Sequence, residues 1–358
     1  MIYTITCQRA RNYGAVLQPY ALAEFLKKNN NVVKVIDYKP KYLNQSLTSK
    51  NFVFNLVRSI IQFPDRYKGN RVFGTFLDRY VPLTTESYSS CSDMEQRLPP
   101  AKIYIAGSDQ IWNMNCPNGY DDSYFLKFAD GHGRKVAYAA SFAMEELSDL
   151  QKERVESLTK DFYAVSIREN SGTELFKKAT NRKAITVADP VFLLSASEWS
   201  KLASEKYSKD KYVLVYAFYR QKEVFQYAKR LAEKEKCKVY FVNTAYLDCI
   251  MPCNKYLWCV SPNDFIALIK NAESVVTNSF HGLSFSLIFH KDVHVFYPPR
   301  KGNSRLEDIL KLTGLINRVV RDNKIIKENI DYRQVDRNLQ LFMENSKKFL
   351  IETLVEKV

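Results

Sequence analysis

The sequence predicts an α/β fold of two domains whose parallel sheets face a central cleft. Short runs rich in β-branched and aromatic residues alternate with amphipathic helical stretches, which is the pattern of parallel α/β sheets. The chain has 358 residues, of which 46% are hydrophobic. At about 100–200 residues per domain, this length favours two domains.

The first half of the chain contains a helix expected at residues 15–28 and a series of short strands. These strands are expected at residues 1–6, 31–37, 101–106, 135–140, 164–167 and 184–187. A helical, basic and Phe-rich insertion at about 50–80 interrupts their rhythm. Two interpretations of it stay open: a helical pair packed on the domain, and an interfacial helix at an anionic membrane.

The second half repeats the alternation, with strands expected at 212–218, 238–243, 273–277 and 293–297 and helices at 221–235 and 282–289. Ser261-Pro262 is typical of a helix start, and Ser195 with Glu198 has the spacing of a capping box. We therefore expect an N-terminal domain at 1–200, a C-terminal domain at 201–338, and an amphipathic helix at 339–358 that packs back on the body.

The composition points to anionic partners. Lys and Arg number 53 against 39 Asp and Glu, a formal net charge of +14. This balance suits a phosphorylated small molecule or an acidic membrane face. Nucleic acid is not expected, because the basic residues are scattered and no recognition motif is present. Residues 1–10 lack a signal-peptide core, so we expect a cytoplasmic protein, with the interfacial helix placing it at the inner face of the membrane as the alternative.

The seven cysteines are an odd number spread along the chain, and we expect reduced thiols. Cys249, Cys253 and Cys259 are close in sequence but lack the spacing and the neighbouring His of a zinc site. We therefore expect neither a metal nor a cofactor.

Ligands of open parallel sheets bind outside the carboxyl ends of the strands, so residues that follow strands are the site candidates. The first strand and the strand at 101–106 are followed by hydrogen-bonding groups and an indole ring, which suit a sugar. These acceptor-side candidates are Asn12, Gly14, Ser108, Asp109, Gln110 and Trp112. A turn held by Ser and Asp side chains is the alternative interpretation.

Two later strands are followed by groups suited to an anion. Arg168 can form paired hydrogen bonds to phosphate or carboxylate, and Glu169 beside it can orient the arginine or act as a base. An exposed ion pair is the alternative there. His281 follows the strand at 273–277 at a helix start, where backbone N–H groups attract phosphate.

Together these motifs resemble the polysaccharide pyruvyl transferase family. The matching segments run in order along most of the chain: Asn12 to Gln18 with Tyr20 to Leu22, Ala106 to Asn113, Tyr138 to Phe142, Ser166 to Glu169, Asp189 to Leu194, and Thr277 to Gly282. The resemblance implies a GT-B-like fold of two Rossmann-like domains. It also implies phosphoenolpyruvate as the donor, no cofactor, and a pyruvate ketal formed on a sugar of a surface polysaccharide precursor.

The resemblance also implies roles for individual residues. The donor-binding Arg of the family corresponds to Arg168 and its essential His to His281, which would supply a proton or stabilise the departing phosphate. Glu169 is the third catalytic candidate. The donor-side group is Arg168, Asn278, Ser279, His281, Gly282 and Arg305.

The sequence departs from the family pattern at two places. Some members carry an Arg where this chain has Ser279, and Arg305 and Lys301 are the candidates to replace it. The family often has Gly at the position of Ala143, which matters only if that position needs a positive φ.

Two other functions stay open at this point: a glycosyltransferase that uses a nucleotide sugar, and a non-catalytic sugar-binding protein. Whether the acceptor is lipid-linked or nucleotide-linked is also open.

Overall fold

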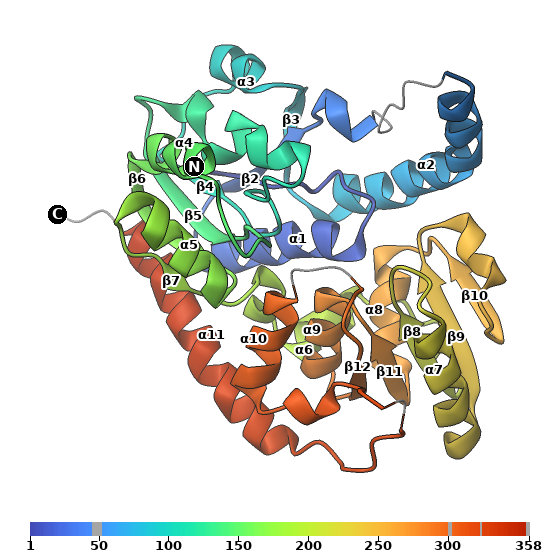
Figure 1. Cartoon of the computed structure of the whole chain (residues 1–358). Coiled ribbons are helices and arrows are strands. Elements are labelled where there is room, and N and C mark those ends of the chain that lie inside the picture. Colours follow the sequence, from blue (N-terminus) through green and yellow to red (C-terminus); the bar gives the residue numbers. More distant parts are fainter. Residues whose placement is uncertain (45–51, 300–302, 323, 356–358) are drawn as a thin grey trace.

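The computed structural model describes residues 1–44, 52–299, 303–322 and 324–355. It contains two parallel β-sheets, each with helices packed on its faces, and the N-terminal sheet lies above the C-terminal one in Figure 1. A single hydrophobic core cluster includes Leu17 of the first domain and Leu214 of the second. The ring of Tyr13 stacks on that of Phe265 across the boundary, with centroids 4.2 Å apart. The two domains therefore share buried apolar surface.

The N-terminal sheet has seven strands in the order β3-β2-β1-β4-β5-β6-β7, all parallel. The strand order reverses between β1 and β4, which is the topological switch point of a Rossmann-like sheet. The strands are β1 (Ile2–Ile5), β2 (Val33–Tyr38), β3 (Leu83–Tyr88), β4 (Ile103–Ala106), β5 (Arg134–Ala140), β6 (Phe162–Ile167) and β7 (Ile185–Thr186).

The C-terminal sheet has five parallel strands in the order β10-β9-β8-β11-β12, with its switch point between β8 and β11. Its strands are β8 (Tyr212–Tyr216), β9 (Lys238–Asn243), β10 (Lys255–Trp258), β11 (Ser274–Thr277) and β12 (Asp292–Val295). Each sheet therefore has one crevice at the carboxyl ends of its strands where a ligand is expected.

The helices connect and cover these strands. They are α1 (Tyr13–Lys28), α2 (Phe52–Tyr80), α3 (Cys91–Arg97), α4 (Asp149–Thr159), α5 (Asn170–Thr180), α6 (Ala196–Leu202), α7 (Lys222–Glu235), α8 (Pro262–Asn271), α9 (Phe280–Ile288), α10 (Ser304–Thr313) and α11 (Tyr332–Leu354). Short 3₁₀ segments lie at Lys41–Asn44, Pro117–Tyr120, Asp122–Phe125, Lys127–Ala129, Pro190–Leu193, Tyr246–Ile250 and Ile316–Arg318.

Both helix starts expected from the sequence are confirmed. Ser195 forms a reciprocal capping box with Glu198 at the start of α6. Ser261 accepts a hydrogen bond from the Asp264 N–H at the start of α8, where Pro262 occupies the first turn. Capping depends on residues only a few positions apart, so the sequence alone is enough to identify these helix starts.

Two strands, β3 and β10, were not expected from the sequence. Both lie at the edges of their sheets. Residues of β3 are mostly partly or fully exposed, unlike the fully buried β1 and β8. An edge strand can be polar because one side of it meets solvent, so it lacks the continuous apolar run of a buried parallel strand.

The Phe-rich insertion forms one helix, α2, rather than a pair of helices. Its second half packs on the first domain through the buried side chains of Phe73, Phe76 and Leu77. Its earlier turns project from the body (Figure 1), and Pro64 lies inside the helix. Large apolar side chains are exposed there: Ile60, Ile61, Phe63 and Tyr67. Among the described helices, none is both long and apolar enough to cross a membrane.

Helix α11 runs from the C-terminal domain back to the N-terminal one (Figure 1). Ser346 Oγ accepts a hydrogen bond from the Ala188 N–H at 2.8 Å. Arg134 Nη1 donates to the carbonyl of Thr353 at 2.6 Å. This helix therefore connects the two domains a second time, in addition to the chain segment between β7 and β8.

Candidate active site

A polar cluster forms where the carboxyl ends of strands from both sheets meet, and Asp189 lies at its centre. The side-chain Oδ2 of Asp189 accepts hydrogen bonds from Ser108 Oγ at 2.9 Å and from Arg168 Nη1 at 2.6 Å. His281 Nε2 lies 3.6 Å from the same oxygen. Ser108, Arg168 and Asp189 follow β4, β6 and β7, whereas His281 follows β11, so both domains contribute.

A second carboxylate completes the contacts of the arginine. Arg168 Nη2 lies 3.3 Å from Asp109 Oδ1. Asp109 has a φ of +76°, a left-handed conformation that is uncommon outside glycine and is several-fold enriched for Asp. The guanidinium of Arg168 also stacks over the ring of Phe280, 4.8 Å from its centroid. Arg168 is therefore held on three sides.

The charges in this cluster stabilise one another. Burial alone would raise the pKa of Asp189, but the nearby His281 and Arg168 outweigh it and hold the pKa well below its ordinary value. Burial also raises the pKa of Asp109, but the positive charge of Arg168 lowers it, and the pKa of Asp109 is lowered overall. For Arg168, burial is outweighed by Asp189 and Asp109, so its pKa is raised. Both carboxyl groups are therefore ionised at neutral pH.

Arg305, the second residue of α10, brings a further cation to the cluster. With its amide oxygen turned toward the guanidinium, Gln110 accepts hydrogen bonds from both Nη atoms of Arg305 at 3.1 and 3.2 Å. Burial and the neighbouring Arg168 lower the pKa of Arg305. Two guanidinium groups so close together favour an anion between them.

Several buried polar atoms of the cluster have no hydrogen-bond partner among the described residues. They are Arg168 Nε, Glu169 Oε2, His281 Nε2 and Arg305 Nε. Of these four residues, Arg168 and Arg305 line a cavity of about 240 Å³, together with Asp189 and Phe280. Unpaired buried donors are costly, and a bound ligand is one explanation for them. The cations and the cavity together fit a small anion.

The two domains meet at the site through a glycine. A Cβ atom built on Gly14 would lie 1.9 Å from His281 Nδ1, so only glycine leaves room for the imidazole. Gly14 follows β1 at the switch point of the first sheet, and His281 follows β11 at that of the second. The structure thus brings the two expected crevices into direct contact.

The turn that carries His281 is built by its neighbours. Asn278 uses both ends of its amide to bind the backbone of Phe218, at 2.8 and 2.9 Å. Ser279 caps α9, and a Cβ on Gly282 would lie 2.3 Å from Thr277 Oγ1. The amide of Asn278 therefore has a structural role in this turn, and its contact with the donor stays a prediction. Ser279 and Gly282 also have local structural roles here.

Glu169 is fully buried and holds the loop after β5. Its Oε1 accepts three hydrogen bonds, from Ser141 Oγ at 3.0 Å and from the Phe142 and Ala143 N–H groups at 2.9 and 3.1 Å. Ala143 has a φ of +48°, so the position where the family often has glycine does require a left-handed backbone. The role of Glu169 as a base stays a prediction.

Two acceptor-side candidates have other roles. Trp112 is fully buried, and its ring stacks on Phe125 with centroids 5.2 Å apart. Its Nε1–H donates to the carbonyl of Tyr124. The hypothesis that this ring stacks on a sugar is therefore wrong. Asn12 caps α1 by accepting from the Gly14 N–H at 2.8 Å, so its oxygen is not free for a ligand.

The remaining acceptor-side candidates lie among the donor-side ones. Ser108 contacts Asp189, Asp109 contacts Arg168, and Gln110 contacts Arg305. The expected separation into an acceptor and a donor side is thus not seen at these residues. Lys301 lies outside the described residues.

Asp189 is the residue that the sequence reasoning missed. In the sequence, the segment Asp189 to Leu194 stands out only as part of the family pattern. A signal for it existed, because Asp189 follows the strand at 184–187 just as Arg168 follows β6.

Two solved epimerase structures with TM-scores above 0.5 support the same architecture. The UDP-N-acetylglucosamine 2-epimerase from Rickettsia bellii matches with a TM-score of 0.51 at 9% identity, over 99% of this chain and 95% of that one. The Methanocaldococcus jannaschii UDP-GlcNAc 2-epimerase, in complex with UDP-GlcNAc and UDP, gives 0.51 at 12% identity over 99% of both chains. The E. coli heptosyltransferase WaaC with ADP gives 0.40 at 12% identity, over 99% and 100%.

These likenesses are to the fold alone, which is GT-B-like with two Rossmann-like domains. No curated protein matches the sequence. The family model described as polysaccharide pyruvyl transferase matches residues 12–298, which include the start of α1, Arg168, Asp189 and the His281 turn. The chain therefore belongs to the polysaccharide pyruvyl transferase family.

Proposed function

We propose that the chain transfers a pyruvyl group from phosphoenolpyruvate to two hydroxyls of a sugar and forms a cyclic ketal on a polysaccharide precursor. The observation that carries this proposal is a cavity lined by Arg168 and Arg305, whose buried Nε atoms both lack a partner among the described residues. Family membership supports pyruvyl transfer in the same site.

The donor has two anionic groups that need separate partners. Phosphoenolpyruvate carries a phosphate and a carboxylate, and the cluster offers two guanidinium groups and the first turn of α9. Asp189 and Asp109 compensate part of this positive charge, but Arg305 has no carboxylate within ion-pair distance among the described residues. Arg305 is therefore the cation most available to the ligand.

The chemistry moves two protons: each sugar hydroxyl loses one, the methylene carbon gains one, and the departing phosphate takes up the other. Protonation of the methylene carbon makes the neighbouring carbon electrophilic, and the oxygen of one sugar hydroxyl bonds to it and loses its proton. The C–O bond to phosphate then breaks, and a second hydroxyl closes the ketal as its proton leaves. The sum is ketal plus phosphate, with no change of oxidation state.

We assign these proton transfers to His281. Its Nε2 is buried, has no hydrogen-bond partner among the described residues and lies 3.6 Å from Asp189 Oδ2, which can orient the imidazole. Asp189 acts through His281 and Arg168, and we assign it a positioning role. Glu169 Oε1 is engaged with the loop, so we assign Glu169 the same kind of role.

Calorimetric titration with phosphoenolpyruvate, UDP and GDP tests the proposal. We expect the wild type to bind phosphoenolpyruvate, and Arg305→Met to weaken this binding by about tenfold or more, because a charged hydrogen-bond donor is lost. Arg305 is preferred to the more buried Arg168, whose removal would leave the buried carboxylates of Asp109 and Asp189 without their arginine partner.

The exposed Arg79 provides the matched control, since Arg79→Met removes the same charge outside the site. Binding of UDP or GDP without phosphoenolpyruvate would reject the proposed donor and favour a glycosyltransferase. Equal affinity of the wild type and Arg305→Met for phosphoenolpyruvate would reject the proposed donor site.

A further inference from the structure

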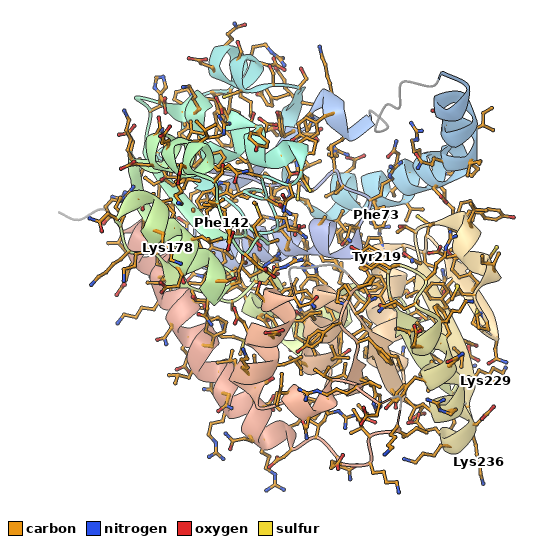
Figure 2. The ribbon with its side chains drawn as sticks, in the orientation of Figure 1. Phe73, Phe142, Lys178, Tyr219, Lys229 and Lys236 are labelled. Carbon is orange, nitrogen blue, oxygen red and sulfur yellow. The ribbon has the colours of Figure 1, made fainter. Side chains whose placement is uncertain are left out.

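A second cavity, of about 330 Å³, lies between the loop after β1 and helix α2. Three basic side chains line it, those of Arg9, Arg11 and Lys39. Phe73, labelled in Figure 2, belongs to the α2 wall of the cavity and packs edge-on against Tyr13 of α1. The cavity therefore opens at the carboxyl edge of the first sheet, near the start of α1.

The positive charge of this cavity is only partly compensated. Asp37, which is buried behind it, pairs with both Arg9 at 2.5 Å and Lys39 at 2.8 Å. Arg9 also approaches the exposed Asp78 at 3.7 Å. Arg11 forms no hydrogen bond or ion pair with any described residue, although it is half-buried. One buried carboxylate thus holds two cations in place while a third stays unpaired.

Arg11 is placed where its charge is unfavourable without a ligand. Burial lowers its pKa, and the neighbouring Arg66 lowers it further, which Asp65 opposes only in part. The aliphatic part of Arg11 packs on α2, since a Cβ built on Gly69 would lie 2.7 Å from Arg11 Cδ. A bound anion would satisfy this side chain in the conformation that it already has.

Helix α2 keeps space open above these cations. Gly69 and Gly74 both line the cavity and both lie inside the helix, where each glycine costs about 1 kcal/mol relative to alanine. A Cβ on Gly74 would meet no atom within 4 Å. Packing therefore does not require this second glycine, and any side chain at the position would have free space to enter.

The cavity and the candidate active site lie at the same edge of the first sheet, and residues of the two places are neighbours in the sequence. Arg11 precedes Gly14 by three residues, and the Gly14 backbone packs against His281. A molecule with a sugar near His281 and an anionic group a short distance away could contact both places.

We propose that this cavity binds the phosphate or diphosphate group that links the acceptor sugar to its carrier. That the bound molecule is the acceptor sugar rests on the proposed function. The binding of a phosphate group depends only on the residues that line this cavity. The exposed apolar side chains of α2, Ile60, Ile61, Phe63 and Tyr67, lie on the same helix and suit a lipid carrier. A nucleotide carrier would use the same phosphate contacts.

Titration of inorganic pyrophosphate into the wild type, Arg11→Met and Arg79→Met tests the site. We expect Arg11→Met to weaken pyrophosphate binding by about tenfold or more and to leave the affinity for phosphoenolpyruvate unchanged. Methionine keeps the aliphatic packing on Gly69. Arg79→Met, on the same helix but outside the cavity, should alter neither affinity.

A second variant fills the cavity without changing its charge. Gly74→Leu should weaken pyrophosphate binding as Arg11→Met does, while thermal unfolding shows that the protein remains folded. Unchanged pyrophosphate affinity in both variants would overturn the proposal. Equal loss of phosphoenolpyruvate affinity in Arg11→Met would also overturn it, because Arg11 would then belong to the donor site.

The carrier is identified by two further probes. Binding of UDP that weakens in Arg11→Met would indicate a nucleotide. Sedimentation with phosphatidylglycerol vesicles that is lost in both Arg11→Met and Phe63→Ser would indicate a lipid. If the wild type fails to bind phosphoenolpyruvate but still binds pyrophosphate through Arg11, the proposed function fails and the phosphate site stands.

Discussion

At the scale of single residues, Asp189 connects the groups on which the chemistry depends. It contacts Ser108 and Arg168 of its own domain and approaches His281 of the other. A buried carboxylate with several charged partners fixes their orientation, but it also makes the folded state sensitive to its protonation.

The first residue-scale prediction concerns His281. His281→Ala should lower the rate of pyruvyl transfer by about 10²–10⁴-fold, because a positioned acid or base typically contributes that much. Phosphate release from phosphoenolpyruvate in the presence of an acceptor measures the rate. His132→Ala removes an exposed histidine outside the site and should keep full activity. An active His281→Ala variant would exclude this histidine from the mechanism.

The second residue-scale prediction concerns pH. The pKa of Asp189 is lower in the folded protein than in the unfolded chain, where an Asp titrates at about 3.9. Its contribution to stability is therefore present above that pH and is lost as the pH falls below it. Asp189→Asn should lower the free energy of unfolding by about 3 kcal/mol at neutral pH.

Urea unfolding at several pH values between about 5 and about 3 measures this dependence. The Asp189→Asn variant cannot lose that carboxylate, so its stability should fall less steeply on acidification than that of the wild type. Equal slopes for the two proteins would show that Asp189 does not titrate in the expected direction.

At the scale of elements, the start of α1 and the start of α9 fit together only because residue 14 is glycine. The sequence placed Gly14 and His281 after their respective strands, but it did not show that they touch. Contact between them depends on how the two sheets are oriented, and residues about 270 positions apart carry no local signal of that orientation.

Gly14→Ala should therefore lower activity by about a hundredfold, since displacement of a catalytic group by about 1 Å has an effect of that size. The methyl group would displace the imidazole, while the gain in helix propensity of about 1 kcal/mol offsets part of the strain. Activity and thermal unfolding measured together separate the two effects.

Gly74→Ala serves as the stability control for this experiment, because its methyl group meets no neighbour. It should raise the free energy of unfolding by about 0.5–1 kcal/mol. If Gly14→Ala kept full activity, His281 would be free to move, and the close fit of the two elements would not matter for catalysis.

At the scale of the whole molecule, the two domains are joined through a continuous core and by α11. Helix α11 lines the candidate cavity with Phe342 and binds the first domain through Ser346. Its attachment should therefore influence both stability and the shape of the site.

Leu350 is fully buried on α11, whereas Leu341 on the same helix is 65% exposed. Leu350→Ala should lower the free energy of unfolding by about 2–5 kcal/mol, as is usual for a core leucine. Leu341→Ala should change it by less than about 0.5 kcal/mol. Urea unfolding of both variants measures the difference, and similar values for the two would contradict the packing of α11.

The sequence by itself determined the α/β class, the buried strands and the helix starts at Ser195 and Ser261. These features depend on local periodicity and capping, which neighbouring residues specify. It also placed Arg168 and His281 after strands, at the edge where ligands bind.

Only the tertiary structure decided which of these residues meet. It joined Asp189 to Arg168 and His281, turned Trp112 into the core, and put Arg11 beneath α2 with no ion-pair partner among the described residues. It also revealed the edge strands β3 and β10, whose polar or short sequences carry no buried-strand pattern. The physical reason is that burial and charge pairing depend on the packing of distant segments, whereas periodicity and capping depend on neighbours along the chain.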